Sequence, residues 1–317
     1  MKDYRYKPRI VSISYMATRL FIAMTLGLAQ APAVALDDTS GALRTLTVDG
    51  VEREWQILVP DSYRDGERVP LVLEFHGTGA TPESQTELSG FPALAKEQGF
   101  LLVAPVARYQ RVQDQRLTWN VDLHDDAVDD VAFIDALLDR VSAQYAVDPA
   151  RIYAVGFSGG ARMSSRLACD LSDRIAAISA VAGLRFPEDC QPSRPVPVIA
   201  FHGRKDVINH YEHQPNSPDY WRMGVEDALT GWIGNNGCNA RPKVERLGNN
   251  DARLAYVDCR QGANVTFYRS ELANHTWPGT PLADGIRERW GPETVSDVPA
   301  TTLTWAFFAS HPMPAAD

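Results

Sequence analysis

The sequence predicts an α/β fold with a mostly parallel central sheet flanked by helices. Short apolar stretches rich in β-branched residues alternate with amphipathic stretches, which is typical of strands connected by helices. A glycine-rich turn at 156–160 stands directly between such a strand and such a helix. No repeat, low-complexity linker or shift in composition marks a second module, so we expect one domain over residues 36–317.

The first half of the chain carries four strand-like stretches and one long amphipathic segment. The strands are expected at 43–48, 55–59, 70–76 and 100–105. The turn Asp49-Gly50 predicts that the first two form an antiparallel pair, and a helix near 92–98 leads into the fourth. A long helix is expected from Val128, because apolar side chains recur in steps of three and four on one face: Val131, Ile134, Leu138, Val141 and Tyr145.

The second half continues the alternation around the glycine-rich turn. A strand is expected at 151–155 and a helix at 161–171. Later strands are expected at 175–182, 196–202 and 265–268, before a closing helix at 301–310. The stretch 210–251 is rich in Asn, Gly and Pro, and we interpret it as an insertion rather than a domain.

The first 35 residues are interpreted as an export signal. Basic residues precede an apolar run from Leu20 to Ala29, and Ala33-Val34-Ala35 supplies the small-x-small pattern of a cleavage site. The run is short for a membrane span, although an uncleaved anchor is the alternative. We therefore expect a secreted or periplasmic protein with no stable membrane anchor.

Composition narrows the classes of partner. The net charge of −9 argues against nucleic acid and anionic membrane surfaces, both of which would repel the chain. Four cysteines in an oxidising compartment predict two disulfides. Of the three pairings we expect Cys169–Cys190 and Cys238–Cys259, because each closes a local loop. A zinc site is the alternative, but no CxxC or closely spaced His/Cys pair supports it, and we expect neither metal nor cofactor.

Gly156-Phe157-Ser158-Gly159-Gly160 fits the G-x-S-x-G pattern. A serine at a sharp strand-to-helix turn is held with its hydroxyl projecting from the sheet edge, and small neighbours let the chain pass close to itself. The alternative is a glycine-rich loop with an incidental serine. The strand before and the helix after favour Ser158 as a nucleophile.

A serine nucleophile needs a base, and the base needs an acid to fix its tautomer. His275 lies in a turn-rich loop after the last predicted strand, and Asp206 follows the strand at 196–202. The order Ser158, Asp206, His275 is that of the α/β-hydrolase fold. Backbone amides of Gly159 and Thr78 are the expected oxyanion-hole donors, since Thr78 lies in the glycine-rich loop after the strand at 70–76.

Further motifs accompany this triad. They are His76-Gly77, Asp129–Ile134, Val147–Tyr153, Arg166–Cys169, Asn236-Gly237-Cys238 and His275–Gly279. Through them the chain resembles the polyhydroxybutyrate depolymerase family of esterases, which also contains feruloyl and acetylxylan esterases. The resemblance places the family's triad on Ser158, Asp206 and His275. Family members commonly carry Cys where this chain has Thr78, but only the amide matters at that position.

The resemblance implies a serine esterase acting on feruloyl, acetyl or hydroxybutyrate esters, either small molecules or oligomeric and polysaccharide-linked esters. A peptidase of the same fold and a catalytically silent binding protein are the alternatives. Trp119, Trp221 and Trp277 are candidates for lining the substrate pocket, with core packing as the alternative. Since His275 must be neutral to act as a base, activity is expected to fall in acid.

Overall fold

The computed structural model describes residues 41–111, 114–280 and 296–314, all within one compact unit spanning Asp37–Asp317. The predicted export signal at 1–35 lies outside the described residues. Within them, no helix is both long and apolar enough to cross a membrane.

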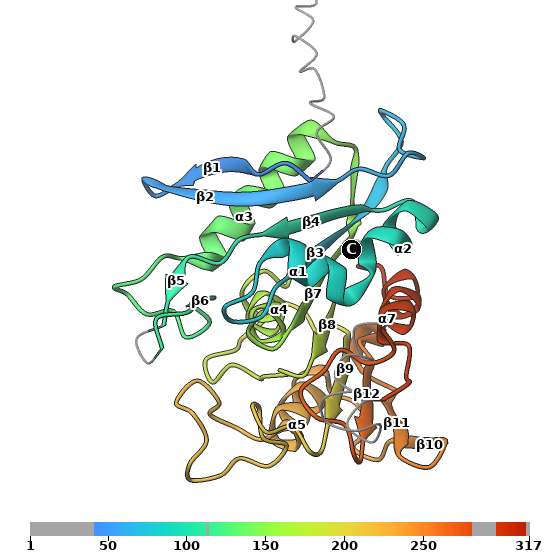
Figure 1. Cartoon of the computed structure of the whole chain (residues 1–317). Coiled ribbons are helices and arrows are strands. Elements are labelled where there is room, and N and C mark those ends of the chain that lie inside the picture. The colour runs from blue at the N-terminus through green and yellow to red at the C-terminus, as the bar shows by residue number, and fades with distance from the viewer. Residues whose placement is uncertain (1–40, 112–113, 281–295, 315–317) are drawn as a thin grey trace, which may run out of the picture. The chain divides into compact units, whose positions relative to one another are not determined.

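One sheet runs through the unit (Figure 1), with ten strands in the order β1-β2-β4-β3-β7-β8-β9-β12-β11-β10. The strands are β1 Arg44–Val48, β2 Val51–Leu58, β3 Val69–Phe75, β4 Leu101–Pro105, β7 Val147–Phe157, β8 Ala177–Val181, β9 Val198–Gly203, β10 Lys243–Leu247, β11 Asp251–Tyr256 and β12 Val265–Ser270. The six strands from β4 to β12 pair in parallel, while β1, β2, β11 and β10 add antiparallel edges. A separate short hairpin joins β5 Tyr109–Gln110 to β6 Leu117–Thr118.

Helices cover both faces of the sheet, which confirms the predicted fold class. They are α1 Pro82–Ser89, α2 Phe91–Gln98, α3 Asp130–Gln144, α4 Gly159–Asp170, α5 Val225–Asn236 and α7 Ala300–Ala309. Successive strand side chains point to opposite faces, so Leu71 and Leu73 pack in the core beneath α3, α4 and α5, whereas Val72 packs in the core beneath α2 and α7. Burial on both faces explains why the central strands are continuous apolar runs.

The pairing of the parallel strands determines which loops meet at the carboxyl edge. Phe75 pairs with Gly156, so the loop after β3 lies beside the turn after β7. Gly203 pairs with Ser270, so the loop after β9 lies beside the loop after β12. The sheet therefore brings the predicted oxyanion loop to the predicted nucleophile, and the predicted acid to the predicted base.

The stretch 210–251 contains more regular structure than its composition indicated. It holds α5 and β10, and β11 begins at its end, so the sheet continues for two strands beyond β12. We interpreted the stretch only as an insertion. Strand β10 (sequence KVERL) was not predicted because it lacks an apolar run. It is an edge strand whose side chains are mostly exposed.

Both disulfides form as predicted. Cys169, near the end of α4, bonds to Cys190, and Cys238, just after α5, bonds to Cys259. In the described residues, no group of three or more His, Cys, Asp or Glu side chains is arranged to hold a metal ion.

Glu74 is a buried acid in β3 and gives the first testable prediction. Burial raises the pKa of its carboxyl to about 7, an effect that hydrogen bonds from Ser89 and Gln85 only partly offset. In the unfolded chain the group ionises at lower pH, so folding stability falls as pH rises from about 4.5 towards 7. The isosteric change Glu74→Gln should raise the free energy of unfolding by up to about 3 kcal/mol at pH 8 and have little effect near pH 4. Thermal unfolding of both proteins at the two pH values tests this, and an equal difference at both pH values would contradict it.

Candidate active site

Ser158 sits at the junction of β7 and α4 in a strained backbone conformation. Its φ is +55° and its ψ −112°, a region that non-glycine residues rarely adopt and that costs about 1–3 kcal/mol. Its amide donates to the carbonyl of Val181 at 2.9 Å, which ties the turn to β8. The side chain thus stands at the carboxyl edge of the sheet, at the N-terminus of α4.

Glycine is required around this turn for steric reasons. A Cβ at Gly160 would lie 2.0 Å from the carbonyl oxygen of Phe75, and one at Gly183 would lie 2.3 Å from that of Ser158. Both distances are far inside van der Waals contact, so the backbones can approach only if side chains are absent. The glycines at these positions therefore allow the ends of β3, β7 and β8 to pack closely together.

Asp206 lies in the loop after β9 and is buried. Its Oδ1 accepts from the amides of Ile208 and Asn209, both at 2.8 Å, and its Oδ2 accepts from Nδ1 of His275 at 2.7 Å. Burial alone would raise the pKa of this carboxyl, but hydrogen bonds from His202 and His275 hold it below its ordinary value. Asp206 is therefore an ionised, fixed acceptor at neutral pH.

His275 lies beside the nucleophile turn. Its ring centroid is 4.8 Å from that of Phe157, the residue before Ser158. Because Nδ1 donates to Asp206, the neutral ring presents the lone pair of Nε2 as its basic position. The described residues include no hydrogen bond from the Ser158 hydroxyl to His275, and in unliganded enzymes such bonds often tighten only when substrate is bound.

His202 is a second histidine in contact with Asp206. Its Nε2 lies 3.3 Å from Oδ2 of Asp206 and 2.9 Å from the carbonyl of Asn209. Its ring stacks on Trp221, whose indole N–H donates to the carbonyl of His210. A histidine that ends a strand four residues before the acid was the available signal for this contact.

The predicted oxyanion loop lies against the nucleophile turn. Its conformation is fixed by a hydrogen bond from the Gly79 amide to Leu117 and by a 2.8 Å contact between the hydroxyls of Thr78 and Thr118. A Cβ at Gly159 would lie 3.1 Å from the Thr78 amide nitrogen. The backbones of Thr78 and Gly159 therefore lie close together beside Ser158, and their role as oxyanion-hole donors stays a prediction.

The buried side chain of His76 helps to fix the conformation of this loop through hydrogen bonds. Its Nδ1 lies 2.8 Å from the carbonyl of Gly77, and its Nε2 accepts from the amide of Ala107 at 3.0 Å. Burial lowers the pKa of His76, so the ring is neutral and its Nδ1–H donates. Trp119 donates its indole N–H to the carbonyl of His76 at 2.9 Å, which fixes the loop further.

The three candidate pocket tryptophans have different surroundings. Trp277 has no exposed surface, lies against Phe91 and donates its indole N–H to Thr301, so its predicted role in the substrate pocket is wrong. Trp221 is likewise buried, against His202. Only Trp119 reaches a cavity wall, and its substrate contact stays a prediction.

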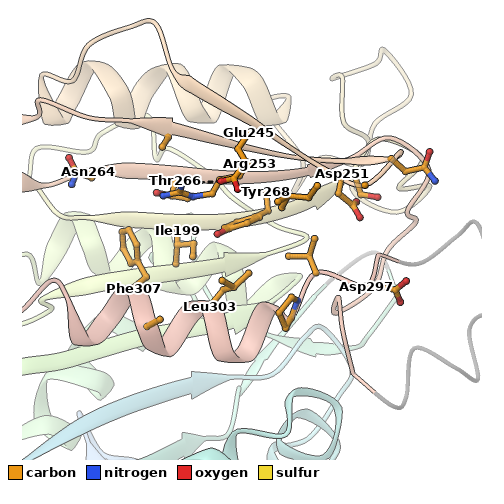
Figure 2. Close-up of a pocket in the computed structure, with 18 of the residues that line it drawn as sticks. Ile199, Glu245, Asp251, Arg253, Asn264, Thr266, Tyr268, Asp297, Leu303 and Phe307 are labelled. Carbon is orange, nitrogen blue, oxygen red and sulfur yellow. Dashed lines mark hydrogen bonds and ion pairs between the residues drawn. The ribbon is translucent and has the colours of Figure 1, made fainter.

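A cavity of about 230 Å³ adjoins the oxyanion loop through Thr118 and Trp119. A larger cavity of about 1050 Å³ lies elsewhere, between the face of β9, β12 and β11 and helix α7. Figure 2 shows Thr266 and Tyr268 on its sheet side and Leu303 and Phe307 on α7. None of Ser158, Asp206 and His275 lines either cavity. The smaller one is the candidate substrate pocket because Thr118, which lines it, contacts Thr78 of the predicted oxyanion loop.

Known structures with similar backbones confirm the class of fold. The acetyl xylan esterase from Aspergillus awamori superposes with a TM-score of 0.57 at 16% identity, covering 80% of this chain and 100% of that one. The protein titled sOPH superposes with a TM-score of 0.56 at 19% identity, covering 87% and 88%. The protein has the α/β-hydrolase fold.

Sequence comparison then gives the family. The model of the esterase PHB depolymerase family matches residues 57–216, and the chain belongs to this family. Feruloyl esterase B of Piromyces equi is 30% identical to this chain in sequence. The aligned part covers 65% of this chain but only 39% of the length of that relative. The putative esterase NocK of Nocardia uniformis subsp. tsuyamanensis is 27% identical, over 76% of this chain and 75% of the relative. Family membership confirms the predicted enzyme class, carboxylic ester hydrolase.

Proposed function

We propose that the protein hydrolyses carboxylic esters through Ser158, His275 and Asp206. His275 takes the hydroxyl proton as Ser158 attacks the ester carbonyl, and Asp206 stabilises the imidazolium that forms. The alcohol leaves with the proton from His275. Water, activated by the same imidazole, then releases the acid and restores the serine.

The amides of Thr78 and Gly159 serve as donors to the oxyanion in both steps. They act well because the loop is already fixed by Thr118, Leu117 and His76, and no reorganisation is needed as negative charge develops. Loss of one such donor typically costs about a hundredfold or more in kcat.

One observation carries the proposal. Asp206 holds Nδ1 of His275 at 2.7 Å while the same imidazole lies against Phe157, next to the strained Ser158. These contacts support a convergence of the three residues, distant in sequence, at one edge of the sheet. The strained backbone at Ser158 lowers stability, and such strain is typical of functional sites.

The substrate class follows from the relatives. Curated relatives are named feruloyl esterases and acetylxylan esterases, and the family is named for polyhydroxybutyrate depolymerases. We therefore propose feruloyl, acetyl or hydroxybutyrate-oligomer esters. The signal-like segment at 1–35 and the two disulfides support secretion or a periplasmic location.

Hydrolysis assays test this function directly. The purified protein should hydrolyse p-nitrophenyl acetate, and comparison of methyl ferulate, acetylated xylan and hydroxybutyrate oligomers by kcat/KM should single out one class. Activity is expected to fall in acid, because the proposed mechanism needs an imidazole that can accept a proton. A folded protein that hydrolyses none of these esters would contradict the proposal and favour a binding role.

A further inference from the structure

The cavity beside the oxyanion loop is rich in positive charge. Among the described residues that line it are four arginines, Arg111, Arg162, Arg185 and Arg222, against two aspartates, Asp122 and Asp219. The chain as a whole carries a net charge of −9, so the cavity gathers side-chain charges opposite in sign to the net charge of the chain. Local charge beside a reacting centre determines which substrates bind there.

Three of these arginines already have carboxylate partners. Arg185 pairs with Asp122 at 2.6 Å, and Arg222, at the half-exposed rim, approaches Asp122 at 3.6 Å. Arg111 pairs with Asp114. Each of these three arginines therefore has a carboxylate of the protein close to it.

Arg162 differs from the other three. It is only 4% exposed, and no carboxylate of the described residues lies within ion-pair distance of it. Its guanidinium faces the Tyr220 ring at 4.6 Å, and Nη1 makes one long hydrogen bond of 3.5 Å to Asn209. Burial lowers its pKa to about 10, so it remains charged at neutral pH. A buried cation without a counter-ion is costly unless something else neutralises it.

The position of Arg162 relates this charge to the reaction. It lies four residues after Ser158, and its amide donates to the Ser158 carbonyl at 3.2 Å in the first turn of α4. Thr118 lines the same cavity and contacts Thr78 of the oxyanion loop. The backbone contact and the shared cavity wall place Arg162 beside the Ser158 turn, and an anion bound by Arg162 would adjoin the predicted oxyanion loop.

We propose that the substrate ester carries a carboxylate near the scissile bond and that Arg162 binds this carboxylate. The inference rests on the proposed function, whose substrate class it narrows. The planar guanidinium matches a carboxylate through paired hydrogen bonds. The cavity of about 230 Å³ has room for a short chain or one ring, since a cavity of about 150 Å³ can hold benzene.

The carboxylate can belong to either half of the ester, and two pairs of probes distinguish these cases. On the acid side, mono-p-nitrophenyl glutarate is compared with the neutral p-nitrophenyl pentanoate. On the alcohol side, 3-butyryloxybutanoate is compared with its primary amide. In each pair the ratio of kcat/KM for the charged over the neutral ester is measured for the wild type, Arg162→Met and Arg162→Lys.

The wild type should favour the charged ester at least about tenfold in one pair, because a charge-assisted hydrogen bond discriminates by this much or more. Arg162→Met should abolish the preference, so that the ratio of kcat/KM for the charged over the neutral ester falls to about one, and Arg162→Lys should restore part of the preference. The control Arg174→Met, which removes an arginine that pairs with Asp135 and Asp139 on α3, should leave both ratios unchanged.

A measurement on the wild type tests the carboxylate proposal even if the variants misfold. Glutarate should inhibit hydrolysis of the neutral ester competitively, and glutaramide should inhibit it at least about tenfold more weakly. Equal kcat/KM for charged and neutral esters in both pairs would overturn the carboxylate proposal and leave the esterase proposal intact. If the folded wild type hydrolysed none of the four esters, this result would overturn the esterase proposal itself.

Discussion

Replacing Ser158 with alanine is expected to lower kcat/KM for p-nitrophenyl acetate by about 10⁴-fold or more. The change removes the attacking oxygen and leaves the oxyanion donors, Thr78 and Gly159, in place. Residual catalysis from these donors sets the lower limit of the rate. Steady-state kinetics with the purified variant give the ratio.

The loss should be catalytic rather than structural. Alanine keeps the Cβ that the turn already accommodates at φ +55°, so the melting temperature should stay near that of the wild type. Ser310→Ala, which removes a hydroxyl at the end of α7, is the matched control and should keep full activity. A Ser158→Ala variant with more than about a tenth of wild-type activity would require another nucleophile.

Replacing Asp206 with asparagine is expected to lower kcat by about 10⁴-fold with a small change in KM. The carboxylate accepts from Nδ1 of His275 and so keeps Nε2 as the base. An amide can still accept from Ile208 and Asn209 through its oxygen, but it then turns its NH₂ group towards His275. The imidazole is forced into the tautomer whose Nε2 carries a proton and cannot act as a base.

The control for this variant is Asp135→Asn on α3, which removes a charge that pairs with Arg174. It should leave kcat unchanged. Because the pKa of Asp206 is held below its ordinary value, its carboxylate also stabilises the folded protein at neutral pH, and this contribution is lost as pH falls into the acid range. Normal kcat in Asp206→Asn would show that another group orients His275.

Much of the site was predictable because its signals are local. The strand, the tight turn at Ser158 and the helix after it lie within one short segment, and glycines are needed wherever the backbones approach closely. The contact between Asp206 and His275 was predictable because parallel strands place their following loops at one edge. The disulfides follow from even cysteine count and short loops.

Features that depend on contacts between distant segments were not predictable. Nothing near Trp277 in the sequence indicates that Phe91 and α7 bury it. Strand β10 lacks an apolar run because it is an exposed edge. In the sequence, nothing distinguishes Arg162 from other arginines in helices. Only the fold shows that its guanidinium lies at a cavity, without a carboxylate partner among the described residues.

The most direct test of the triad is chemical labelling. A fluorophosphonate reacts with a serine only where a neighbouring base activates the hydroxyl and an oxyanion hole accepts the phosphoryl oxygen. Peptide mapping by mass spectrometry after complete inactivation should find one adduct, on Ser158, and none in His275→Ala treated in the same way. Inactivation with the adduct on another residue, or full esterase activity after quantitative labelling of Ser158, would contradict the account.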